Sequence, residues 1–84
     1  MDTTAALNRV RDKLEASFGK ALSMMIVASA SNVAGVPTMG MTRDQFLSFA
    51  EAVAHDQRVI DMWGASGAGD ALIQWKQLAE QVSV

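Results

Sequence analysis

Apolar residues recur every three or four positions along the first part of the chain, a spacing that places side chains on one face of an α-helix. Thr3 or Thr4 precedes this stripe and is suited to cap the N-terminus of such a helix. Gly19 interrupts the stripe, at a cost of about 1 kcal/mol relative to alanine in a helix. The pattern therefore predicts a long helix over residues 1–30, either continuous or bent at Gly19. The stripe consists of Leu7, Val10, Leu14, Phe18, Leu22 and Met25.

The next segment, residues 31–41, contains asparagine, glycine and proline, and this composition predicts a loop. Thr42 and Gln45 then have the spacing of a capping box, in which each side chain bonds the backbone N–H of the other residue. We therefore expect a two-faced helix from Arg43 to about His55. Its apolar face is formed by Phe46, Phe49, Ala50 and Val53, and its polar face by Asp44, Ser48, Glu51 and His55.

Asp56 is placed to cap a third helix, which the glycines at positions 64, 67 and 69 are expected to end. A last helix is expected to begin near Asp70. No segment alternates between apolar and polar residues with a period of two, so we expect no β-sheet. The sequence predicts an all-α fold with a single small helical domain over residues 1–84. This small helical bundle would have three to five helices, with a long first helix and short C-terminal helices in residues 42–84.

Residues 21–42 carry no ionisable side chain, and such a segment is expected to be buried in the core or against a partner. A chain of 84 residues buries only about 60–65% of its unfolded surface, so its stability is marginal unless a disulfide, a metal or a partner adds to it. The chain has no cysteine, which excludes disulfides and thiolate metal sites and makes the reducing cytoplasm the expected location. We therefore expect self-association or a protein partner. The expected partner-binding residues are Leu22, Met25, Ile26, Val27, Val33, Val36, Met39, Trp63 and Trp75.

Membrane insertion and nucleic-acid binding are not expected. A membrane-spanning helix needs about 20 predominantly apolar residues, and Pro37 with its neighbouring glycines would break such a helix. The start of the chain has mixed charge rather than the basic region of a secretory signal. The formal net charge is −2, and acidic residues interrupt the basic ones that could contact phosphates. Those basic residues are Arg9, Arg11, Lys13 and Lys20.

Three groups of residues could carry chemistry, and each has a simpler structural interpretation. The glycine-rich segment 64–69 lacks the spacing of a dinucleotide-binding loop and the lysine of a phosphate-binding loop, so a helix connector is favoured. Glu51 and His55 lie four residues apart, but a zinc centre needs more ligands than this pair supplies. Met39 and Met41 suit a soft metal, yet methionine more commonly fills cores and interfaces. We therefore predict no enzymatic activity, no cofactor and no metal.

A further pattern covers about half of the chain. It consists of Met41-Thr42, Gln45, Phe46, Phe49, Val53-Ala54, Asp56 and Val59, followed by Gly69-Asp70-Ala71-Leu72-Ile73. With these residues the segment 41–84 resembles the leader-peptide domain family first noticed among nitrogen-fixation genes. The resemblance implies a small helical module that a modifying enzyme recognises. The core peptide and the small-residue cleavage site of that family have no counterpart here, and residues 1–40 lie outside the resemblance.

These patterns favour a non-enzymatic helical module for protein–protein interaction, either a homo-oligomer or a small subunit or adaptor of a larger assembly. Two alternatives stay open. One is a helix-turn-helix DNA-binding regulator formed by residues 43–55 and the helix after Asp56, with Arg58 on the recognition helix. The other is a leader-like domain that a modifying enzyme recognises.

Overall fold

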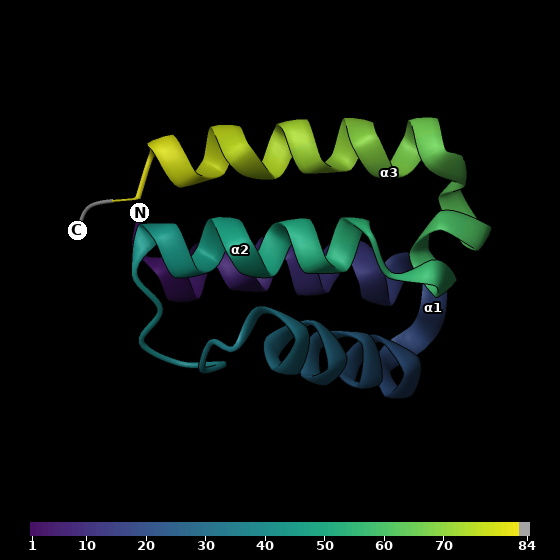
Figure 1. The fold of residues 1–84 in the computed structure, drawn as a ribbon, viewed down its shortest axis with the longest axis horizontal. Coiled ribbons are helices and arrows are strands. Elements are labelled where there is room, and N and C mark those ends of the chain that lie inside the picture. The colour runs from purple at the N-terminus through teal and green to yellow at the C-terminus, as the bar shows by residue number, and fades with distance from the viewer. Residues whose placement is uncertain (83–84) are drawn as a thin grey trace.

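The computed structural model describes residues 1–82 and contains three helices in this part of the chain, with no strand. They are α1 (Thr3–Ala34), α2 (Arg43–Ala54) and α3 (Gln57–Glu80). In Figure 1, α2 lies between the long part of α3 and the second half of α1, and the first half of α1 runs behind α2. The all-α prediction is confirmed.

Two glycines break the long helices. Gly19 lies at φ 79° and ψ 171°, and Gly64 at φ 77° and ψ 162°. This backbone region is accessible almost exclusively to glycine, because the Cβ atom of any other residue would clash with the adjacent backbone. Each break divides its helix into two arms. We call residues 3–18 and 20–34 the first and second arms of α1, and residues 57–63 and 65–80 the first and second arms of α3.

The helix boundaries differ from the expected ones at two places. The first helix continues past residue 30 to Ala34, where Gly35 in the left-handed conformation (φ 68°) provides the C-cap, so the loop is shorter than predicted. In α3, the non-helical backbone is confined to Gly64, and the other two glycines of the cluster remain in the helix. The short helical arm that Asp56 caps therefore ends at Gly64, as predicted, but the second arm of α3 begins at residue 65 and not near Asp70.

The helix N-termini are capped by side chains. Thr42 and Gln45 form the predicted capping box, with donor–acceptor distances of 3.1 and 3.0 Å. Asp56 caps α3 as predicted. At α1 the cap is Asp2, whose carboxylate accepts a hydrogen bond from the backbone N–H of Ala5 at 2.8 Å, and neither threonine that was considered there has this role.

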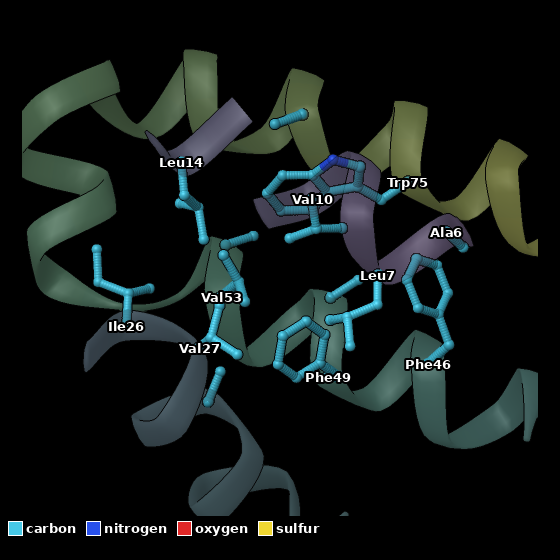
Figure 2. Close-up of a cluster of buried hydrophobic side chains, with 14 of the residues drawn as sticks. Ala6, Leu7, Val10, Leu14, Ile26, Val27, Phe46, Phe49, Val53 and Trp75 are labelled. Atoms are coloured by element: carbon cyan, nitrogen blue, oxygen red, sulfur yellow. The ribbon is translucent and has the colours of Figure 1, made fainter. Parts of the chain in front are cut away.

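One hydrophobic core joins all three helices. Phe46, Phe49 and Val53 of α2 are fully buried between side chains of both arms of α1 and of α3 (Figure 2). The core members from α1 include Val10 and Leu14 of its first arm and Ile26 of its second arm, all of them fully buried. The segment 41–82 therefore shares its core with the first 34 residues and does not pack as a separate unit.

Trp63 connects the two glycine breaks. Its indole Nε1 donates a hydrogen bond to the Ser17 hydroxyl at 2.8 Å. Its ring lies 6.1 Å from that of Phe18 and 6.2 Å from that of Trp75, measured between centroids. Phe18 immediately precedes Gly19, and Trp63 immediately precedes Gly64, so both breaks lie at the same end of the bundle (Figure 1). These contacts hold the end of the first arm of α1 against α3.

Replacing Gly64 by alanine should destabilise the fold, whereas Gly69→Ala should stabilise it. A Cβ atom meets nothing within 4 Å at either position, so the two substitutions differ in backbone conformation and not in steric contact. We expect Gly64→Ala to lower the free energy of unfolding by about 1–3 kcal/mol. Gly69→Ala, inside a regular helix, should raise it by about 0.5–1 kcal/mol. Denaturant titration measures both, and a stabilised Gly64→Ala variant would contradict the assigned strain.

The pair formed by Asp56 and Arg58 should make stability depend on pH. The Arg58 guanidinium bonds the Asp56 carboxylate at 2.7 and 3.0 Å, and these bonds hold the pKa of the carboxyl below its ordinary value of 3.8. A lowered folded-state pKa contributes stability above pH 3.8 that is lost as the pH falls through the folded-state value. Asp56→Asn should therefore be less stable than wild type at neutral pH. The difference should shrink in acid, and a difference independent of pH would exclude this contribution.

Candidate functional site

The second arm of α1 lies at the edge of the bundle (Figure 1). One face of this arm is largely apolar and exposed. We call this the uncharged face. Its residues are Ala21, Met24, Met25, Ala28 and Asn32, all of them exposed. Met24 and Met25 are 58% and 59% accessible, which is high for large apolar side chains in a folded domain. The chain itself therefore leaves this face uncovered.

The spacing of these residues makes the face continuous. Positions 21, 25, 28 and 32 follow at intervals of four, three and four, which forms a stripe along one side of the helix. Met24 flanks this stripe. At 1.5 Å per residue the stripe is about 16 Å long. Lys20 precedes it and the next ionisable residue is Arg43, so no charged side chain interrupts it.

The polarity of this arm is partly inverted, because two serines lie on its inner side while methionines lie on its outer side. Ser23 is fully buried, and its hydroxyl has no hydrogen-bond partner among the described residues. Ser31 is also buried and donates its hydroxyl hydrogen bond to the carbonyl of Val36. A surface helix ordinarily places its polar residues toward water and its apolar residues toward the core. The exposed apolar side therefore resembles a surface that another molecule covers.

Two more exposed apolar side chains follow at the C-terminal end of the arm. Val33 is 77% accessible, and Met39, in the loop between α1 and α2, is 83% accessible. This loop continues directly from the end of the arm at Gly35 (Figure 1). The apolar surface therefore extends beyond the stripe.

The structure divides the predicted partner-binding residues into three groups. Met25, Val33 and Met39 are exposed, and Leu22, Val36 and Trp63 are partly buried against the core. Ile26, Val27 and Trp75 are buried in the core, at 0%, 4% and 2% accessibility (Figure 2). The latter three side chains are therefore not available to a partner in this conformation.

The sequence-based set omitted Ala21, Met24, Ala28 and Asn32. A signal for them exists in the four–three–four spacing around Met25, but the neighbouring residues are almost equally apolar. The pattern of residues 21–30 therefore does not distinguish the inner side of this helix from its outer side.

A second surface feature is a shallow groove of about 330 Å³ between the first arm of α1 and the second arm of α3. Arg9 and Lys13 lie on one side of it, and the glutamines at positions 74, 77 and 81 on the other. Lys13 also lies over the Trp63 ring, with its Nζ atom 5.2 Å from the ring centroid. Two cations one helical turn apart give this groove a local positive charge, but they are few for binding a polyanion.

The polar residues of α2 do not gather into a metal site. Within residues 1–82, no group of three or more histidine, aspartate or glutamate side chains is placed to hold an ion. Glu51 instead faces Lys76 of α3, with an oxygen–nitrogen distance of 3.9 Å between two half-exposed side chains. His55 forms the C-cap of α2.

None of the helices in residues 1–82 combines the length and the apolar composition that crossing a lipid bilayer requires. No protein-family model, no curated protein and no solved structure matches the chain. The assignment of the candidate site therefore rests on the geometry and chemistry of the chain itself.

Ser23→Ala should stabilise the folded chain. The substitution removes a buried hydroxyl that lacks a partner, while the rest of the packing is kept. We expect the free energy of unfolding to rise by about 1 kcal/mol. Denaturant titration checks this value, with Ser48→Ala on the exposed side of α2 as a control that should change stability much less. A destabilised Ser23→Ala variant would indicate that the hydroxyl makes a hydrogen bond in solution.

Proposed function

We propose that this protein is a non-enzymatic protein–protein interaction module that buries its uncharged face against a helix of another protein chain. The observation that carries the proposal is the exposed, charge-free helix face on an arm whose inner side holds two buried serines. Its working form is a homo-oligomer, or a small subunit or adaptor of a larger assembly. Because the chain is free of cysteine, the cytoplasm is its proposed location.

The energetics support a face that extends beyond its two methionines. Fully burying a methionine side chain contributes about 1.5–3 kcal/mol, and Met24 and Met25 are already partly covered, so each can add about half of that. Association costs at least about 4 kcal/mol in lost translational and rotational freedom. Together the two methionines therefore contribute about 1.5–3 kcal/mol, which is less than this cost. Val33 and Met39, the most exposed of the large apolar residues, are suited to supply the remainder.

The leader-like alternative also has another protein recognise a helical surface, but it places that surface elsewhere on the molecule. The residues that resemble the leader-peptide domain family lie in α2 and α3. The uncharged face lies in α1, outside that resemblance. An enzyme that recognised the leader-like segment would therefore contact a different side of the molecule, and variants in α1 would not affect it.

The DNA-binding alternative receives less support. Arg58, the basic residue expected on the recognition helix, is held by Asp56 through two guanidinium hydrogen bonds. Asp61 lies on the same short arm of α3 and adds negative charge. A protein that binds DNA neutralises several phosphates with free basic side chains. This surface offers few of them.

Photo-crosslinking tests the proposed function. A photoreactive amino acid at Met25 should form adducts with a protein chain in the source cells, whereas the same group at Met62 should form few. Met62 is a matched control because it is 52% accessible, close to the 59% of Met25, and belongs to α3 and not to the uncharged face.

The captured chain, identified by mass spectrometry and then purified, should bind wild-type protein and Met62→Glu alike. Its binding to Met25→Glu should be at least about tenfold weaker, because a buried, unpaired charge opposes association. Val27→Asp is unsuitable for this test, since it places a charge in the core. Equal adducts from both positions, or equal binding of both glutamate variants, would remove the uncharged face from the function.

A further inference from the structure

We infer that the chain covering the uncharged face is a second copy of this protein, packed so that the second arms of α1 run antiparallel about a two-fold axis. Met25 of each copy then lies opposite Ala28 of the other. The inference rests on the proposed function and makes it specific, because it names the partner and the register. Three properties of the face support it.

The first property is charge. A two-fold interface brings the same surface of both copies together, so any ionised residue near the axis meets its own like charge. The uncharged face has none, since residues 21–42 contain no ionisable side chain. The exposed sides of the first arm of α1, of α2 and of α3 carry ionisable residues, among them Arg9, Asp12, Glu51 and Asp61. Of the helix surfaces in residues 1–82, the uncharged face is therefore the best suited to self-association.

The second property is side-chain size. Centring the two-fold axis between residues 26 and 27 places Met25 opposite Ala28 and Ala21 opposite Asn32. Each large side chain then faces a small one, which allows close packing across the interface. A parallel pairing instead places methionine against methionine and alanine against alanine. Moving the antiparallel axis toward the N-terminus by two residues pairs Met24 with Met25 and Ala21 with Ala28, again large with large and small with small.

The third property is complementarity between Lys20 and the helix end. In the antiparallel register, Lys20 of one copy lies opposite Val33 of the other, beside the last carbonyls of the partner helix. A helix C-terminus carries a partial negative charge, and a cation near it is stabilising. The last turn of α1 contains no basic residue of its own. In the dimer, Lys20 of each copy would place a positive charge beside the C-terminus of α1 in the other copy.

The interface is expected to be small. A standard stable interface buries about 800 Å² on each partner, which is about one sixth of the accessible surface of 4687 Å². A stripe about 16 Å long covers part of this area, and Val33 and Met39 extend it at both ends of an antiparallel pair. We therefore expect association that depends on concentration, so the mass must be measured over a range of concentrations.

Sedimentation equilibrium of purified protein tests the partner and the register together. Wild type and Met62→Glu should approach twice the monomer mass of 9.0 kDa as concentration rises. Met25→Glu and Ala28→Lys should each show a dissociation constant at least about tenfold higher. An equimolar mixture of these two variants should recover the dimer, because the register brings the new glutamate against the new lysine. Both variants are changed at exposed positions and should retain the fold, which circular dichroism checks.

Disulfide trapping reports the orientation directly, since the natural chain contains no cysteine. Isotope-labelled Met25→Cys is mixed with unlabelled Ala28→Cys. The yield of the disulfide between positions 25 and 28 should be several-fold higher than the combined yield of the 25–25 and 28–28 disulfides. A predominance of homodisulfides would overturn the antiparallel register and leave self-association standing.

Wild-type protein that stays monomeric at every concentration would overturn the inference. The proposed function would still hold if the group at Met25 captured a different chain whose binding Met25→Glu weakens. The proposed function would fail together with the inference if the photoreactive group at position 25 captured no protein chain.

Discussion

The arrangement of the whole bundle depends on two glycine residues in a backbone conformation that other residues rarely adopt. Gly19 and Gly64 each redirect a helix, and they lie at the same end of the molecule, where Trp63 and Phe18 pack together. Without the breaks, α1 with its 32 residues would extend well beyond the 12 residues of α2 and could not fold back along it. The break at Gly19 lets both arms of α1 pack against one short central helix.

This geometry also determines which surface stays uncovered. The second arm of α1 packs on α2 with Ile26 and Val27, and its opposite side faces away from the bundle. In a domain of this size there are too few helices to enclose an edge helix completely. The apolar residues on its outer side therefore stay exposed in a monomer, and the proposed contact with another chain would cover them.

The candidate site illustrates how far a hydrophobic pattern can be interpreted. The absence of charge from residues 21–42 suggested the candidate site, and of the residues predicted to bind a partner, Met25, Val33 and Met39 are exposed. Ile26 and Val27 were selected with them although they lie in the core. A helix that is apolar on nearly all sides carries no periodic signal for its inner face. Burial there depends on where α2 lies, which residues 21–34 do not encode by themselves.

The sequence by itself determined the all-α class, the capping box at Thr42 and the cap at Asp56, because these depend on spacings of a few residues and on local hydrogen bonds. The tertiary structure decided whether α1 bends. A glycine costs only about 1 kcal/mol in a straight helix, which is less than core packing contributes. Whether α1 is straight or bent therefore depends on long-range contacts, such as the hydrogen bond between Trp63 and Ser17. The packing of the second arm of α1 on α2 decided that Met24 and Met25 face outward while Ser23 faces the core.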